Sequence, residues 1–378
     1  MIFPCPRCGQ KNRLPDPPRS DGNYRCGRCR TLLDPLATAV PDEETRPAKR
    51  RRPPVWLRFL TGLAALPLLL LTIANLVGPE RWWFTSFNLY MPQWVWGIPL
   101  PLLLLLYALF AVRWIGVPIA LILWVAGPLM GFTWGWPQSP PPDALRLRVM
   151  TYNVKWGERD ETRLAEEVIR HNPDLLLMQD SAGVLQKKLG KALAGWNIRE
   201  SGQYIAASRL PLSELEWIDI SFPNSNHHAT RGTVTVDGVP LAFITAHLLS
   251  PRYGLVSVRR REIDGLKRNT ESRLIEAERL AERIGQENGP VIVAGDFNAP
   301  QQGLVCRTIE RAGVRDAFRA AGFGYGYTYG RATKARHSYV RIDHIFVSDH
   351  WGIARCFAGT DLASDHCPVI ADIFLRRP

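Results

Sequence analysis

The stretch Val291-Ile292-Val293-Ala294-Gly295-Asp296-Phe297-Asn298 runs from an apolar segment directly into a carboxylate and an amide. Its first four residues predict a short buried strand, and the polar side chains come where that strand ends. Five further segments join strand-like runs to polar residues in this way, at residues 151–154, 178–180, 245–248, 341–344 and 364–366. Six such strand ends in one part of the chain predict that their side chains form a shared site.

The sequence around these segments alternates between strand and helix patterns. Residues 145–154 alternate in polarity as a strand does, whereas residues 162–171 and 270–284 place apolar side chains on one helical face. Asp237-Gly238, between two β-rich runs, is typical of a hairpin turn. These patterns predict an α/β domain over residues 143–378, which is long enough to bury a complete core.

The residue types at the strand ends suit the hydrolysis of a phosphoester. A phosphodiester is anionic, and the hard cation that would neutralise its charge prefers carboxylate and amide oxygens, which Asn153 and Asp180 supply. Asp296 is the candidate for orienting and deprotonating the attacking water. A simpler interpretation of Asn153 is that it caps a turn.

Amide and imidazole groups complete the candidate site. Asn298 and His366 are the candidate donors to the charge that develops on the phosphoryl oxygens. Asp343 could hold the ring of His366, although it could also be an exposed acid at a strand end. His247 could donate to the phosphate or protonate the leaving oxygen. The alternating Tyr325, Tyr327 and Tyr329 fit either a substrate-stacking loop or plain packing.

The six segments read, in chain order, TYNV, MQD, AHL, GDFN, RIDHIFVS and SDHCPV. Their order and spacing resemble those of the endonuclease/exonuclease/phosphatase superfamily. The resemblance covers residues 145–375. It implies a DNase I-like fold, an α/β (α+β) four-layer sandwich of two packed β-sheets flanked by helices. It also implies hydrolysis of phosphoesters with Mg²⁺ (or Mn²⁺) as the cofactor.

The resemblance assigns roles to individual positions. It implies that Asn153 and Asp180 bind the metal and that Asp365 borders a second metal position. It places Asp296, Asn298, His366, Asp343 and His247 in the catalytic set, with the roles argued above. One position departs from the family, which usually has glutamate where Asp180 stands, so the cation would have to sit closer to that strand or be bridged through water.

Three long runs without Asp, Glu, Lys or Arg precede this domain, at residues 59–79, 82–112 and 114–142. They predict three transmembrane helices within residues 55–136, at about 57–77, 94–112 and 114–134. Since only Arg113 separates the second and third runs, two crossings with an interfacial segment are the alternative. Residues 1–58 hold 13 Lys and Arg against 6 Asp and Glu, which favours a cytoplasmic N-terminus. Three crossings then predict a multi-pass protein of the cell (inner) membrane, with the large domain periplasmic or extracellular.

Residues 1–34 carry two CxxC pairs, formed by Cys5, Cys8, Cys26 and Cys29. Two CxxC pairs at this spacing predict a structural Zn²⁺ site in a zinc-ribbon-like head. The alternative is a redox dithiol pair. Residues 35–54 predict an extended linker rich in proline and arginine. The head could dock a cytoplasmic partner.

Together these features predict a membrane-anchored, Mg²⁺-dependent phosphoesterase that cleaves a phosphodiester by metal-assisted in-line attack of water. A net charge of +4 over residues 143–378 neither requires nor excludes a nucleic acid, and lipid and small-molecule phosphoesters also remain candidates. The alternative is a non-catalytic membrane scaffold that binds phosphorylated ligands and docks a partner through its zinc head.

Overall fold

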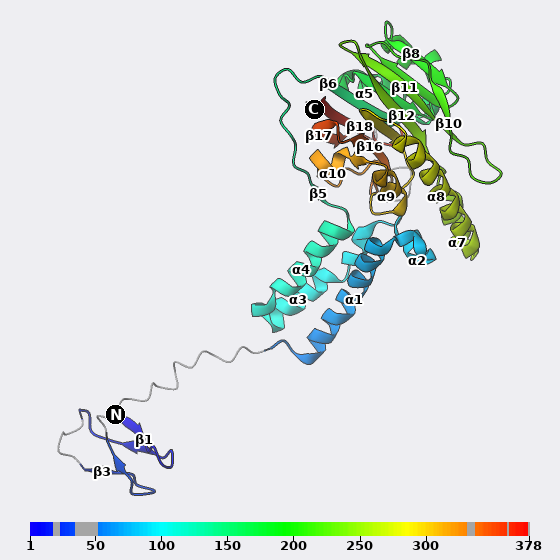
Figure 1. The fold of residues 1–378 in the computed structure, drawn as a ribbon. Helices are drawn as coiled ribbons and strands as arrows, with labels where there is room; N and C mark the ends of the chain where they lie inside the picture. Colours follow the sequence, from blue (N-terminus) through cyan, green and yellow to red (C-terminus); the bar gives the residue numbers. More distant parts are fainter. Residues whose placement is uncertain (18–22, 35–51, 331–336, 361–362, 377–378) are drawn as a thin grey trace. The chain divides into compact units, whose positions relative to one another are not determined.

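The computed structural model describes residues 1–17, 23–34, 52–330, 337–360 and 363–376. It divides into two compact units, Met1–Pro53 and Pro54–Pro378 (Figure 1). Residues 35–51, which make up most of the predicted linker, lie outside the described residues.

The first unit is built from two small antiparallel hairpins. Its strands are β1 (Ile2–Pro4), β2 (Lys11–Arg13), β3 (Tyr24–Arg25) and β4 (Leu32–Leu33). The buried apolar side chains of this unit are Cys5, Leu14, Cys26 and Leu33. So small a core cannot supply much hydrophobic stabilisation, which agrees with the prediction that a metal ion holds the head together.

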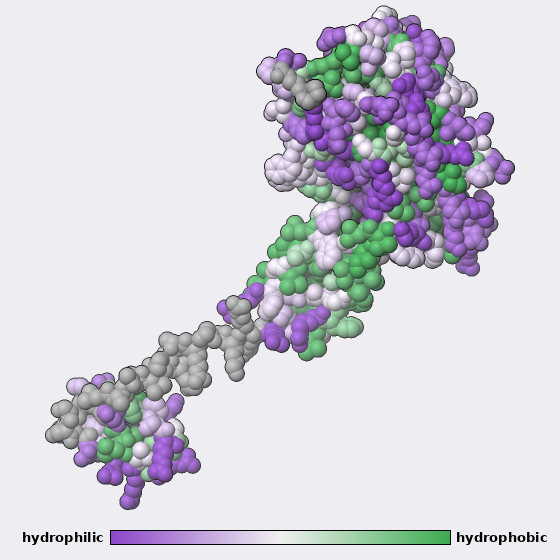
Figure 2. All heavy atoms as spheres, in the orientation of Figure 1, coloured by the Kyte–Doolittle hydropathy of each residue, from purple (hydrophilic) through white to green (hydrophobic). Residues whose placement is uncertain are grey.

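Three helical segments at the start of the second unit are long and apolar enough to cross a membrane, at Val55–Val77, Gln93–Phe110 and Val112–Leu129. The first is the single helix α1 (Val55–Val77); the second contains α3 (Leu100–Phe110), and the third contains α4 (Gly116–Trp124) and a π-helical turn, Val125–Leu129. Most of their surface is apolar, as Figure 2 shows for the helical region. The third segment ends earlier than residue 134, because Thr133 and Trp134 form strand β5.

A short helical segment connects the first two apolar helices. It contains a 3₁₀ turn (Pro79–Arg81) and helix α2 (Trp83–Asn88), and we call residues 79–92 the interspan segment. Tyr90 and Leu89 are both buried, although the segment lies between two candidate membrane spans. The C-terminal part of the interspan segment therefore packs against other parts of the chain, whereas Trp82, Trp83 and Phe84 are exposed.

The rest of the second unit contains two six-stranded mixed sheets (Figure 1). In spatial order the first sheet consists of β10 (Glu216–Asp219), β11 (His228–Val236), β12 (Val239–His247), β13 (Val291–Asp296), β16 (Asp343–Ser348) and β14 (Val314–Asp316). The second consists of β17 (Trp351–Ala358), β18 (Val369–Leu375), β6 (Arg146–Asn153), β7 (Leu175–Gln179), β9 (Tyr204–Ser208) and β8 (Asn197–Ser201). A small ribbon pairs β5 (Thr133–Trp134) with β15 (Phe323–Gly324).

Helices cover the outer faces of both sheets. The helices on these faces are α5 (Glu161–His171), α6 (Lys188–Ala192), α8 (Ile263–Gly285) and α9 (Leu304–Arg311). Helix α7 (Arg252–Arg259) packs against α8, and α10 (Ala317–Ala321) contributes its buried side chains to the core between the sheets. Side chains of α5 and α6 share a core with β6 and β7, and those of α8 and α9 share one with β12 and β13. A third core fills the space between the sheets. The predicted four-layer sandwich of two sheets flanked by helices is confirmed.

Candidate active site

The centre of the site lies at three neighbouring strand ends of the first sheet. His247 ends β12, Asp296 ends β13 and Asp343 begins β16. The strand register pairs His247 with Asp296 and Asp296 with Asp343. Because β12 and β13 are parallel and β16 is antiparallel to them, all three residues come to one edge of the sheet.

The second sheet brings two more predicted residues to this edge. Asn153 ends β6, and its Nδ2 donates to Asp296 Oδ2 at 3.0 Å. Asp180 follows β7 with a φ of 47°, and its Oδ1 lies 3.5 Å from His247 Nδ1. The predicted site therefore forms across the gap between the two sheets, and Asn153 joins them.

His366 and Asp343 form a close pair within the site. His366 Nδ1 lies 2.9 Å from Asp343 Oδ2, and His366 Nε2 lies 3.7 Å from Asp296 Oδ2. The ring of Tyr329 lies beside the imidazole, with 4.9 Å between ring centroids. The predicted pairing of Asp343 with His366 is present, and Asp343 is fully buried rather than an exposed acid.

Asn298 lies in a tight turn directly after β13. Its backbone N–H donates to Asp296 Oδ1 at 2.8 Å, and its Nδ2 donates to the carbonyl of Leu248 at 2.9 Å. The close pairing of β13 with β12 just before this turn needs Gly295, because a Cβ there would lie 1.9 Å from the carbonyl oxygen of Ala246. The turn leaves Asn298 buried beside the site, with a left-handed φ of 49°.

Asp365 is engaged by a residue that the sequence did not single out. Its Oδ2 lies 2.6 Å from Lys155 Nζ, which follows β6 by two residues. Lys155 thus places a cation beside the predicted metal-ligand set. No motif in the sequence marked Lys155, since a lysine after a strand is common.

The electrostatics of the site reflect its buried carboxylates. Burial and the neighbouring Asp343 carboxylate raise the pKa of Asp296 to about 6. Burial alone would lower the pKa of His366, but the carboxylates of Asp343 and Asp296 raise it to about 10. The pKa of His247 is also raised, because Asp180 and Asp296 outweigh the effect of burial. The site therefore holds charged imidazoles against a cluster of buried acids.

The donor set fits a divalent cation. Carboxylate oxygens of Asp296 and Asp343 and a ring nitrogen of His366 lie within 4.8 Å of one another, and all three residues are buried. Asn153 and Asp180 add an amide and a carboxylate at the same edge. Oxygen-rich clusters of this kind suit Mg²⁺ or Mn²⁺, and a cation would relieve the repulsion that raises the pKa of Asp296.

Other residues that the sequence did not reveal orient the predicted ones. Gln203 Oε1 lies 2.7 Å from His247 Nδ1, and the hydroxyl of Tyr204 accepts from the backbone N–H of His247 at 3.0 Å. Gln179 is fully buried and its Nε2 bonds both Thr151 of the second sheet and Thr245 of the first. These contacts depend on which strands are neighbours, so no local pattern could show them.

The three tyrosines Tyr325, Tyr327 and Tyr329 do not share one role. Only Tyr329 lies against a predicted site residue, His366. Tyr325 and Tyr327 donate instead to the carbonyls of Ala126 and Met130, in and just after the third apolar segment. Packing therefore explains those two.

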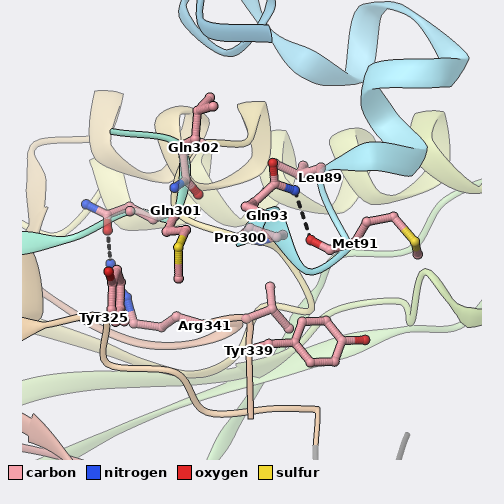
Figure 3. A pocket seen from close by; sticks show the side chains of 13 residues that line it. Leu89, Met91, Gln93, Pro300, Gln301, Gln302, Tyr325, Tyr339 and Arg341 are labelled. Atoms are coloured by element: carbon pink, nitrogen blue, oxygen red, sulfur yellow. Dashed lines mark hydrogen bonds between the residues drawn. The ribbon is translucent and has the colours of Figure 1, made fainter. Parts of the chain in front are cut away.

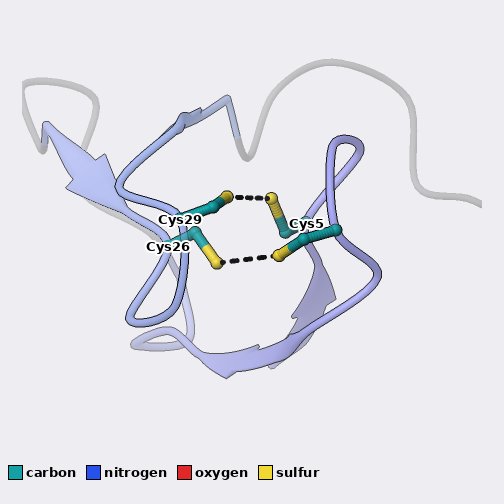
Figure 4. A group of neighbouring side chains, drawn as sticks. Cys5, Cys26 and Cys29 are labelled. Atoms are coloured by element: carbon teal, nitrogen blue, oxygen red, sulfur yellow. Dashed lines mark hydrogen bonds between the residues drawn. The ribbon is translucent and has the colours of Figure 1, made fainter.

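The four predicted zinc ligands come together in the first unit. The Sγ atoms of Cys5, Cys8, Cys26 and Cys29 all lie within 4.8 Å of one another, and none of the four forms a disulfide (Figure 4). Hydrogen bonds from the backbone N–H groups of Cys29 and Arg28 lower the pKa of Cys26 to about 6, despite the opposing effect of burial. Four converging cysteines suit tetrahedral Zn²⁺.

Comparison with known proteins agrees with this architecture. Residues 150–366 match the endonuclease/exonuclease/phosphatase family. An endonuclease/exonuclease/phosphatase family protein from Bacteroides thetaiotaomicron is 18% identical, with 62% of this chain and 100% of that one covered and a TM-score of 0.50. The comparison with curated proteins gave no match.

Two further solved structures have lower scores. The mannosyl-6-phosphatase Bt3783 of B. thetaiotaomicron is 18% identical, covering 60% of this chain and 99% of its own, with a TM-score of 0.48. The 3'-5' exonuclease of Neisseria meningitidis is 19% identical, covering 60% and 98%, with a TM-score of 0.47. The family match spans more than half of the chain and includes the candidate site residues from Asn153 to His366, the first sheet, and the second sheet except for β18 and the start of β6. The chain therefore belongs to the endonuclease/exonuclease/phosphatase family.

Proposed function

We propose that this protein is a membrane-anchored, divalent-metal-dependent phosphoester hydrolase whose substrate is a phosphodiester. The observation that carries the proposal is the convergence of Asp296, Asp343 and His366 within 4.8 Å, next to Asn153 and Asp180. Family membership supports the reaction class, and the three apolar helices support the anchor.

In this proposal, separate residues bind the metal ion and activate the attacking water. A bound Mg²⁺ would neutralise phosphate charge, with Asn153 and Asp180 as its principal ligands and Asp365 at the border of a second position. Asp296, which is buried and lies within hydrogen-bond distance of Asn153, orients and deprotonates the attacking water.

Three groups surround the phosphate in this proposal. Asn298 donates to a phosphoryl oxygen, and the charged imidazole of His366 stabilises the developing negative charge. Asp343 holds the His366 ring in place. His247, tethered by Gln203, donates to the phosphate or to the leaving oxygen.

We further propose that three spans place the zinc head in the cytoplasm and the catalytic domain on the outer side of the cell (inner) membrane. The basic excess of residues 1–58 supports this orientation. Four cysteine ligands would fill a tetrahedral Zn²⁺ site, so a structural or partner-docking role suits the head.

The test is hydrolysis by the purified full chain in detergent. Wild type should hydrolyse bis(p-nitrophenyl) phosphate with Mg²⁺ or Mn²⁺, and Asp296→Ala and His366→Ala should each abolish turnover while the circular dichroism spectrum stays unchanged. Retained turnover in both variants would contradict the assignment. Parallel assays with DNA, RNA and phospholipid vesicles separate the candidate substrates.

A non-catalytic scaffold that binds phosphorylated ligands is the second candidate, favoured by the short Asp180 side chain. Titration calorimetry with Mg²⁺ and Mn²⁺ separates the two, because a scaffold of this kind need not bind either ion.

A further inference from the structure

The interspan segment reaches the loop that carries Asn298. Tyr90 of this segment is only 5% exposed, and its hydroxyl donates to the backbone carbonyl of Asn298 at 3.0 Å. Tyr90 precedes residues 150–366, so it lies outside the part of the chain that matches the family. A residue between two candidate membrane spans thus touches a residue of the proposed active site.

A buried arginine completes this contact. Arg273 of α8 has no exposed surface, and its Nη1 donates to the hydroxyl oxygen of Tyr90 and, at 3.3 Å, to the Asn298 carbonyl. Its guanidinium also lies 5.3 Å from the centre of the Tyr90 ring. Burial raises the pKa of Tyr90 well above its usual range, so the hydroxyl keeps the proton that it donates.

The interspan segment holds the far end of the same loop as well. Glu80 is buried, and its Oε1 accepts from the backbone N–H of Leu304, the first residue of α9. In return, Arg307 of α9 donates to the carbonyls of Asn75 and Leu76 at the end of α1. The interspan segment therefore makes hydrogen bonds at both ends of residues 298–304, through Tyr90 to Asn298 and through Glu80 to Leu304.

The packing between these two contacts is close. Leu89, Met91 and Gln93 line a small cavity together with Pro300 and Gln301 (Figure 3). Gln93 Nε2 donates to the Met91 carbonyl at 2.9 Å, which fixes the chain directly after Tyr90.

The Asn298 carbonyl needs these donors. A buried carbonyl without a partner costs about 1–3 kcal/mol, and Asn298 already adopts an uncommon left-handed conformation. If the carbonyl lost its donors, the peptide after Asn298 could rotate, and the side-chain amide would move with it. Misplacing a catalytic group by about 1 Å can cost a factor of about 10² in rate.

We propose that Tyr90, together with Arg273, is a positioning residue that holds Asn298 in its catalytic geometry, so that the interspan segment is part of the active-site scaffold. This inference rests on the proposed role of Asn298 in holding the phosphate.

Tyr90→Phe tests the proposal in the full chain, because it removes the hydroxyl and keeps the ring. We expect kcat for bis(p-nitrophenyl) phosphate to fall about 10-fold, with KM and the Mg²⁺ requirement changed less than about twofold. The matched control is Tyr107→Phe. Tyr107 is a buried tyrosine of α3 whose hydroxyl lies 2.9 Å from Thr61 Oγ1. The control should leave kcat unchanged, and Arg273→Lys should retain more activity than Arg273→Met.

Hydrogen exchange supplies a measurement that does not need activity. The amides of residues 298–304 should exchange faster in Tyr90→Phe than in wild type or Tyr107→Phe. Wild-type kcat and exchange in Tyr90→Phe would overturn the proposal. Activity of Asn298→Ala and His366→Ala separates this failure from a failure of the proposed function. If both variants are inactive, the proposed function stands and only the role of Tyr90 fails. If both variants are active, the proposed function fails, and hydrogen exchange in Tyr90→Phe decides whether Tyr90 holds the loop.

Discussion

The imidazole of His366 and the carboxylate of Asp343 form a buried pair, with 2.9 Å between Nδ1 and Oδ2. Asp343 begins β16, whereas His366 lies in the loop before β18, and Nε2 of its ring lies 3.7 Å from Asp296 Oδ2. A carboxylate in this position fixes the orientation of the ring and stabilises its charged form.

Asp343→Asn should weaken catalysis by disturbing this pair. An amide cannot stabilise the imidazolium as a carboxylate does, so we expect kcat to fall about 10- to 100-fold with little change in KM. Steady-state kinetics with bis(p-nitrophenyl) phosphate measure the effect. Asp349→Asn, at an exposed position just after β16, is the control and should match wild type. Equal kcat values for the two variants would remove Asp343 from the mechanism.

Asp180→Asn should weaken metal binding more than it changes the reaction itself. Removing a carboxylate from the proposed ligand set should raise the Mg²⁺ concentration for half-maximal activity by about 10-fold or more. Activity measured over a Mg²⁺ titration gives this value, with Asp237→Asn in the exposed hairpin turn as the control. An unchanged Mg²⁺ requirement would show that Asp180 is not a ligand.

The first unit should contain one zinc ion per chain. Cys26→Ala should lose the zinc, because a tetrahedral site needs all four cysteines for full affinity. Metal analysis of the purified full chain by mass spectrometry tests this. Cys356→Ala, which removes a buried cysteine of β17, should keep the zinc. If wild-type protein purified without chelators contains no zinc, the prediction is wrong.

Three spans predict that the zinc head and the catalytic domain lie on opposite sides of the membrane. Protease added to intact spheroplasts should cut the catalytic domain and leave the head protected. Two crossings with an interfacial segment would place both on the same side, so protection of both parts would reject the three-span topology. Lysed cells, in which both parts are accessible, provide the control.

Glu167 should make stability depend on pH. Burial favours its neutral form, but hydrogen bonds from His171 and Thr360, with the charge of Arg170, lower its pKa to about 2. Since the folded pKa lies below the unfolded value of about 4.3, the stabilisation is complete above about pH 5 and disappears as the pH falls toward 2.

Glu167→Gln should therefore lower the free energy of unfolding by about 2–3 kcal/mol at pH 7. The difference from wild type should shrink as the pH falls below 5, and urea unfolding followed by tryptophan fluorescence measures it. Glu166→Gln, at the exposed neighbouring position, should show no such trend. A deficit in Glu167→Gln that stays constant down to pH 3 would exclude this linkage.

Local patterns in the sequence were sufficient to predict the strands that end in polar residues, three apolar helices and two cysteine pairs. This is because the period of apolar residues reports the type of each element and which face is buried. The motif order was sufficient to predict the four-layer sandwich and the set from Asn153 to His366. The end of the third apolar helix was misplaced, because Thr133 and Trp134 pair with residues almost 200 positions later.

Only the tertiary structure decided which residues support that set. Lys155 faces Asp365, Gln203 holds His247, Gln179 joins the two sheets, and Tyr90 reaches Asn298. The partners in the last of these contacts are separated by 208 positions. Periodicity and spacing describe a residue's own element, whereas such contacts depend on how elements pack. The sequence therefore pointed to the groups of the proposed chemistry, and the fold determined which residues contact them.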